Sequence, residues 1–159
     1  MKLGWRVLAL MLVVSLVACS SRGVPRRVSE PTASLQQLTV GADGSWSIEL
    51  RLQNYSSIPM RFEAVSLAFS VEQQAAGTLA AQPALTIGPE SADVITVALV
   101  PSADARLLLA ARLADGRGVQ YRIEGTIDAA PTDRGRVRDY EVERDSRLSP
   151  VPGLPGVLR

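Results

Sequence analysis

The chain of 159 residues has no histidine, one cysteine and one lysine. The cysteine is Cys19 and the lysine is Lys2, so every side-chain cation after residue 2 is an arginine. A lone cysteine excludes an intramolecular disulfide. With no histidine, and no lysine beyond the N-terminus, the chain lacks the usual general bases, amine nucleophiles and soft metal ligands. Only carboxylates, hydroxyls and arginines remain for catalysis.

The sequence motifs of common enzymes are missing as well. There is no Gly-x-Ser-x-Gly elbow, no Walker loop and no dinucleotide fingerprint, and no run of Asp or Asn around a glycine forms a calcium loop. We therefore predict that the protein is not an enzyme and holds no metal ion and no non-covalent cofactor. A hydrolase built on two carboxylates is an open alternative, because such a pair, about 5–10 Å apart, can come from any part of a sequence.

The charges are nearly balanced, with 17 basic and 16 acidic residues, and only 4% of the residues are aromatic. A nucleic-acid-binding surface needs a basic excess, with aromatic side chains for stacking on bases. We therefore expect no nucleic-acid partner.

The N-terminus has the parts of a secretory signal. Lys2 and Arg6 give a positive start, and a largely apolar run of eleven residues extends from Val7 to Val17. As a helix this run is about 16 Å long, roughly half of a ~30 Å hydrocarbon layer, so a stable transmembrane span is not expected.

The residues Leu16-Val17-Ala18-Cys19 resemble a bacterial lipobox. The resemblance implies a diacylglycerol thioether on Cys19, cleavage in front of it and acylation of the new α-amine. Two or more acyl chains anchor a protein stably, whereas one binds reversibly. A free cysteine beside an ordinary secretory cleavage site is the alternative interpretation.

Serines follow Cys19, without the aspartate that in this class usually retains lipoproteins at the inner membrane. We expect a lipid anchor in the outer membrane facing the periplasm, with surface export as the alternative. Three arginines close to the predicted lipid, Arg22, Arg26 and Arg27, are placed to touch anionic headgroups; a solvated linker is the competing interpretation.

Four segments are expected. They are a signal peptide (1–18), the acylated cysteine with a flexible tether (19–34), a folded domain (35–148), and a Pro/Gly-rich tail (149–159) that stays disordered or extended.

Within the folded domain, apolar and polar residues alternate with a period of two, which is typical of half-buried strands. Trp46, Ile48, Leu50 and Leu52 show this most clearly. The stretch through Gly77 and Pro83 is expected to be loose. The pattern predicts six or seven strands, at 38–40, 46–53, 65–71, 94–100, 119–128 and 135–144, the last as a charged edge strand, with a short strand at 85–87 as the optional seventh.

A helix capped by Ser102 or Asp104 is predicted over 103–113. It is apolar on most sides and needs cover, so we place it against the open end of an antiparallel β-sandwich. An all-β fold with one helix is therefore the expected fold class.

Three stretches stand out together: Ile48–Asn54 with the loop ending in Ile58-Pro59, the following strand Val65–Phe69, and Tyr121–Gly125. With them the chain resembles, over residues 35 to about 148, the late embryogenesis abundant type 2 family, also called the WHy domain. The resemblance implies an immunoglobulin- or fibronectin-III-like β-sandwich with one helix, and no established catalytic residues. Bacterial members are often lipoproteins, in agreement with Cys19.

The loop after the first of these strands departs from the family pattern, because Tyr55 and Ser56 stand where members usually have Pro and Asn. We take Asn54, Tyr55, Ser56 and Pro59 as a candidate interaction loop. The competing interpretation is that Asn54 and Pro59 only shape a turn, since Asn bonds to local backbone and Pro fixes φ.

Two functions from different classes fit these observations. The first is a non-enzymatic, membrane-anchored periplasmic lipoprotein that binds an envelope protein or lipid, or protects the envelope under stress. The second is a carrier or chaperone of lipids and other apolar ligands, with the apolar helix as a lid over a groove between the sheets.

Overall fold

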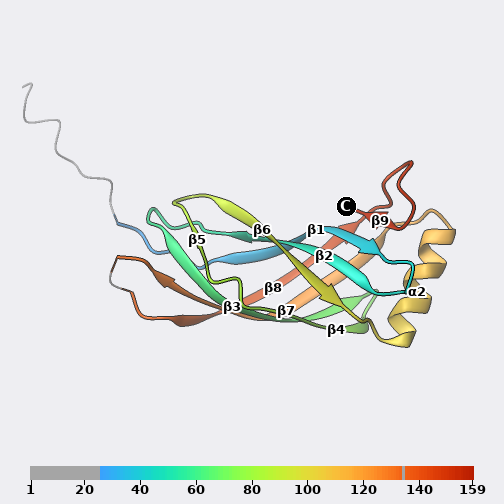
Figure 1. Ribbon diagram of the computed structural model, residues 1–159, viewed down its shortest axis with the longest axis horizontal. Coiled ribbons are helices and arrows are strands. Elements are labelled where there is room, and N and C mark those ends of the chain that lie inside the picture. Colours follow the sequence, from blue (N-terminus) through green and yellow to red (C-terminus); the bar gives the residue numbers. More distant parts are fainter. Residues whose placement is uncertain (1–25, 134) are drawn as a thin grey trace, which may run out of the picture.

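The computed structural model describes residues 26–133 and 135–159, and this part of the chain folds into two antiparallel sheets and one helix (Figure 1). The predicted signal peptide and the lipobox, Leu16 to Cys19, lie outside the described residues. Within the described ranges, no helix is long and apolar enough to cross a membrane.

The first sheet has the strand order β6-β2-β1-β9, and the second has the order β4-β3-β7-β8, with β5 also paired to β3. The strands of the first sheet are β1 (Thr32–Val40), β2 (Trp46–Gln53), β6 (Ala92–Leu99) and β9 (Val157–Leu158). Those of the second are β3 (Met60–Val71), β4 (Gln74–Ala81), β5 (Leu85–Ile87), β7 (Val119–Pro131) and β8 (Arg138–Leu148).

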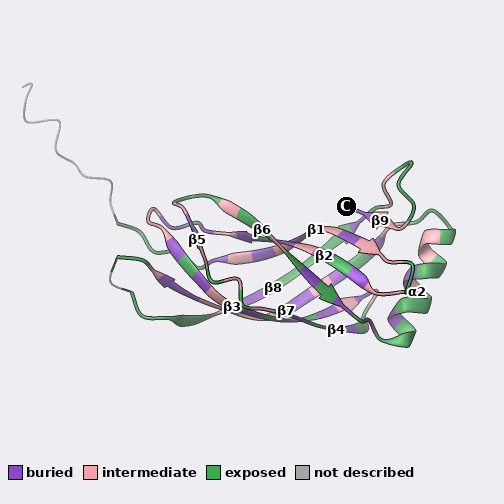
Figure 2. Cartoon of the chain, viewed as in Figure 1, coloured by how far each residue is buried: buried purple, intermediate pink, exposed green. Residues whose placement is uncertain are grey.

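The core fills the space between the sheets, and the predicted alternation produces it. Trp46, Ile48, Leu50 and Leu52 of β2 are all buried, while the residues between them face outward or are partly exposed. Figure 2 shows a similar alternation of buried and exposed residues along β3 and β7, whereas β8 is mostly exposed. Inward-facing side chains of both sheets join in one apolar cluster. The expected all-β class with one helix is confirmed for the described residues.

Helix α2 (Ala103–Ala114) lies across one end of the two sheets, as predicted (Figure 1). Ser102 caps it: the Ser102 Oγ accepts the Ala105 amide at 3.2 Å and donates to the Ala75 carbonyl at 2.6 Å. Only Ala105 and Leu109 of the helix are buried. The helix is therefore covered along one narrow stripe.

The number of strands was underestimated, because nine strands occur in the described residues. The stretch through Gly77, expected to be loose, forms most of β4, with Ala76 and Leu79 buried. Small residues give little hydrophobic signal, yet here they are needed. A Cβ on Gly77 would lie 2.8 Å from Cδ1 of Leu99, which comes from the facing sheet.

The Pro/Gly-rich tail is not disordered or extended as expected, and folds back on itself. Ser149 and Arg159 exchange backbone hydrogen bonds of 2.6 and 2.9 Å, and this hairpin brings β9 alongside β1. Leu158 is fully buried. The domain also starts earlier than residue 35, because β1 begins at Thr32 and Ala33 is buried. β9 has only two residues, which is too few for a period-two alternation to be recognised in the sequence.

Candidate functional site

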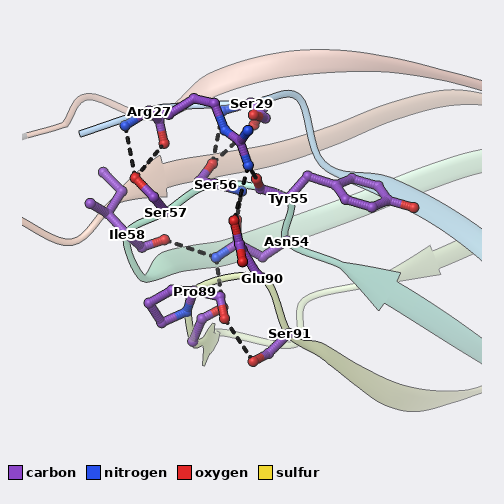
Figure 3. Close-up of polar contacts among 11 residues, drawn as sticks. Arg27, Ser29, Asn54, Tyr55, Ser56, Ser57, Ile58, Pro89, Glu90 and Ser91 are labelled. Atoms are coloured by element: carbon purple, nitrogen blue, oxygen red, sulfur yellow. Dashed lines mark hydrogen bonds and ion pairs between the residues drawn. The ribbon is translucent and has the colours of Figure 1, made fainter. Parts of the chain in front are cut away.

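Asn54 lies directly after β2, and its side chain is fully buried. Its Nδ2 donates to three carbonyl oxygens, those of Ile58 at 2.9 Å, Ile87 at 3.1 Å and Gly88 at 2.8 Å. Its Oδ1 accepts the Ser56 amide at 2.8 Å. One side chain therefore holds together the β2–β3 loop and the turn after β5 (Figure 3).

Ser56 and Ser57 fasten the segment ahead of β1 to the same loop. The buried Ser56 Oγ accepts the Ser29 amide at 2.9 Å and donates to the Ser29 carbonyl at 3.2 Å. The Ser57 amide donates to the Arg27 carbonyl at 2.9 Å, and the Arg27 amide donates to Ser57 Oγ at 2.8 Å. We call these five residues, Arg27, Ser29, Asn54, Ser56 and Ser57, the Asn54 clamp. The predicted flexible tether is thus fixed from Arg27 onward.

A charged pair lies over the clamp. Arg27 Nη2 donates to the Tyr55 carbonyl and to Glu90 Oε1, each at 3.1 Å, and the Glu90 amide donates to the Ser56 carbonyl at 3.0 Å. Both side chains are exposed, so this ion pair contributes at most about 1 kcal/mol. The hydrogen bonds beneath it carry most of the loop's order.

The four residues of the candidate interaction loop take different positions. Asn54 and Ser56 are buried, with their polar atoms bonded within the chain. Pro59 is partly exposed, and its carbonyl accepts the Thr132 amide at 3.2 Å. Tyr55 is half exposed, and its ring points away from the clamp (Figure 3). A partner that touches this loop would therefore meet the ring of Tyr55.

The sequence interpretation did not identify Arg27, Ser29, Ser57 and Glu90 as members of this site. Serine and charged residues in a loop have no pattern that reveals partners more than 25 positions away. The only signal was Asn54 itself, a residue that readily bonds to neighbouring backbone.

Carboxylates gather at a second place, the outer face of β7 and β8. Glu124 stands opposite Glu143 across the two strands, and Arg122 pairs with both of them and with Asp145. Its hydrogen bond to Glu143, together with these charges, raises the pKa of the Arg122 guanidinium above its ordinary value. The three carboxylates are largely exposed and share one guanidinium group, that of Arg122.

Among the residues that the structure describes, no three Asp, Glu or Cys side chains gather closely enough to hold a metal ion.

Comparison with known proteins identifies a protein family whose profile matches this chain. The profile of a family described as late embryogenesis abundant protein, LEA type 2, matches residues 49–142, more than half of the chain. No curated protein sequence matches the chain.

Two solved structures resemble the fold. A protein of Arabidopsis thaliana, solved in solution, is 10% identical, with a TM-score of 0.50 over 82% of this chain and 87% of its own. A crystal structure of a protein from Archaeoglobus fulgidus is 14% identical, with a TM-score of 0.43 over 79% of this chain and 98% of its own. At such identities the likeness concerns the fold alone.

Proposed function

The chain belongs to the late embryogenesis abundant type 2 family, and from this premise we propose that it is a non-enzymatic, membrane-anchored lipoprotein of the periplasm. Its domain serves the cell envelope as a binding or stress-protection module. The anchor is the acylated Cys19 in the outer membrane. The finer fold assignment, an immunoglobulin- or fibronectin-III-like sandwich, is supported by the two facing antiparallel sheets.

The observation that carries this proposal is the Asn54 clamp. It fixes Arg27 and Ser29 onto the domain, so the chain that arrives from the lipobox ends in an ordered attachment. A domain tied down ahead of its first strand suits a protein held at a surface by its N-terminus. The buried polar side chains of the clamp serve the fold, which supports a role in binding or protection rather than in catalysis.

Acylation is tested first. Cells fed an alkyne-tagged palmitate are expected to label the wild-type protein, and mass spectrometry of the N-terminal peptide is expected to show a diacylglycerol and an acyl chain on Cys19. Cys19→Ala is expected to lose the label, while the neighbouring control Ser20→Ala keeps it. A wild-type protein found free in the periplasm with an unmodified thiol would overturn the proposed anchor.

Cross-linking then separates binding from protection. Amine-reactive reagents have no lysine to attack after residue 2, so photo-reactive residues are placed instead at Tyr55, Arg138 and Val151. A discrete adduct at one position identifies a binding surface. Diffuse adducts, together with reduced aggregation of other proteins on drying, identify protection.

The alternative, a carrier of apolar ligands, has less support. The space between the sheets is filled by one cluster of buried apolar side chains, in which Phe69 lies 6.1 Å from Trp46 and 6.4 Å from Tyr121 between ring centroids. A lipid chain would have to displace buried side chains to enter. Native mass spectrometry of the protein from membranes decides the matter, because a carrier would retain a lipid in addition to the one on Cys19.

A further inference from the structure

A groove of about 470 Å³ lies where the segment ahead of β1 passes the loop between β7 and β8. Its lining comes from both segments: Arg26, Val28, Pro131, Gly135, Arg136, Val137, Arg138 and Tyr140. We call it the arginine groove. The chain enters the described structure, and β7 turns into β8, at the end of the molecule opposite α2 (Figure 1).

The charge of this groove is only partly compensated. Arg26 pairs with Asp133 at 3.0 Å, whereas Arg136 and Arg138 are exposed and have no ion pair or hydrogen bond among the described residues. Another groove, of about 510 Å³, is lined by Arg147 and by Arg122, and Arg122 is paired with three carboxylates. The arginine groove therefore presents two guanidinium groups that are available to an anion.

Apolar side chains accompany these cations. Val28 is 43% exposed and Val137 is 52% exposed, and both line the groove beside the half-buried Tyr140. Guanidinium groups bind phosphate oxygens with paired N–H donors. Exposed valines next to them suit a ligand that has an apolar portion beside its phosphate. A phospholipid at a bilayer surface presents both.

The position of the groove favours this ligand. Arg26 is seven positions after Cys19 in the sequence, and a chain of that length reaches at most about 25 Å. A lipid on Cys19 therefore keeps the groove within that distance of the membrane. Arginines near an anionic surface are attracted to it over about a Debye length, roughly 10 Å.

We propose that the arginine groove binds the phosphate of an anionic phospholipid headgroup and holds this end of the domain against the membrane. The proposal rests on the proposed function for its lipid anchor. Of the three arginines expected near the lipid, Arg26 lines this groove, Arg27 is paired with Glu90, and Arg22 lies outside the described residues; Arg136 and Arg138, more than a hundred residues further along the chain, join Arg26.

The test uses the full-length protein, purified from membranes and reconstituted in vesicles of phosphatidylcholine, with or without phosphatidylglycerol. A polarity-sensitive dye is attached to the cysteine of the variant Tyr55→Cys. Position 55 does not line the groove, and the dye there reports on the groove's end of the domain. The same dye on Leu107→Cys, 71% exposed on α2, reports on the opposite end. We expect phosphatidylglycerol to shift the emission of the dye at position 55 to shorter wavelength and to leave the dye at 107 unchanged.

The double variant Arg136→Gln/Arg138→Gln is expected to lower the docking equilibrium constant about 30-fold, because each arginine near an anionic surface contributes about 1 kcal/mol and 1.4 kcal/mol is a factor of ten. The matched control, Arg51→Gln/Arg106→Gln, removes two exposed arginines elsewhere on the domain and is expected to dock like wild type.

Three outcomes would overturn the proposal: equal emission in both kinds of vesicle, an equal loss in the control variant, or loss of docking on addition of low millimolar inorganic phosphate. The last would identify a site for a soluble anion. The mass of the N-terminal peptide is measured on the same preparation. An unmodified Cys19 refutes the anchor, and co-sedimentation of that protein with the two vesicle types still tests the groove.

Discussion

Replacing Asn54 by alanine tests the clamp most directly. The amide has two N–H groups shared among three carbonyl acceptors, and its oxygen accepts one further amide, so about three hydrogen bonds are lost. Each is worth about 1 kcal/mol net, and two of the four backbone groups left without this partner, those of Ile87 and Ser56, belong to buried residues. We expect Asn54→Ala to lower the free energy of unfolding by about 3 kcal/mol.

That loss is a large part of the roughly 5–15 kcal/mol that holds a domain folded. At roughly 3–4 °C per kcal/mol for a domain of this size, the midpoint of thermal unfolding should fall by about 10 °C. Asn54→Asp keeps the shape of the side chain but directs a carboxylate oxygen at the three carbonyls. It is expected to destabilise at least as much at neutral pH, and to recover in part when the carboxyl is protonated.

Circular dichroism during heating and urea titration measures both variants. Tyr55→Ala is the matched control, because this neighbouring side chain is half exposed and is expected to change the free energy of unfolding by less than about 0.5 kcal/mol. Limited trypsin digestion adds a local measure, since release of the clamp exposes the bond after Arg27. If Asn54→Ala costs no more than Tyr55→Ala, and the bond after Arg27 stays resistant, the clamp does not stabilise the domain.

Three further changes have defined outcomes. Deletion of everything after Ser149 removes the buried Leu158 and the pairing of β9 with β1, and urea unfolding is expected to show a loss of about 2–3 kcal/mol; an unchanged midpoint would refute the fold of the tail. Tyr121→Phe removes the hydroxyl that accepts the Leu35 amide at 3.2 Å, so a loss of about 1–2 kcal/mol is expected by the same method, and none if water replaces it. Hydrogen bonds from Ser45 hold the pKa of Asp43 below its usual 3.8, so Asp43 stabilises the fold above that pH and this contribution disappears as the carboxyl is protonated. The difference in unfolding midpoint between wild type and Asp43→Ala should therefore shrink between about pH 5 and pH 2, and a constant difference would contradict the assignment.

The parts of the fold that sequence predicted well are those with a strong local period. β2 has the predicted bounds, and in β6 the predicted face of Val97 and Leu99 is buried. The charged edge strand was found as well, at Arg138–Leu148 where 135–144 was predicted, because among the described residues β8 pairs only with β7. Such elements can be recognised because one face is apolar and the other is polar, and this pattern does not depend on which segments pack against them.

The parts that were missed depend on contacts between distant segments. β4 is built mostly from alanine, glycine and threonine, with Leu79 as its one large apolar side chain, and its Gly77 lies close to Leu99 of the facing sheet. β9 is a strand only because β1 lies beside it. The candidate loop shows the same division: Asn54 indicated a turn, whereas its bonds to Ile87 and Gly88 required the folded chain.

The clamp has a mechanical consequence for a domain held by its N-terminus. A pull on the chain ahead of Arg26 is transmitted first to the exposed ion pair between Arg26 and Asp133, then to the bonds between Arg27 and Ser57, and then to those between Ser29 and Ser56. β1 begins only at Thr32, so these bonds rupture before any strand of the first sheet bears the load. Their loss lengthens the part of the chain that connects the lipid anchor to the domain, and it leaves the two sheets intact. The clamp therefore yields before the sheets do, because it lies between the point of attachment and the part of the protein that must stay folded.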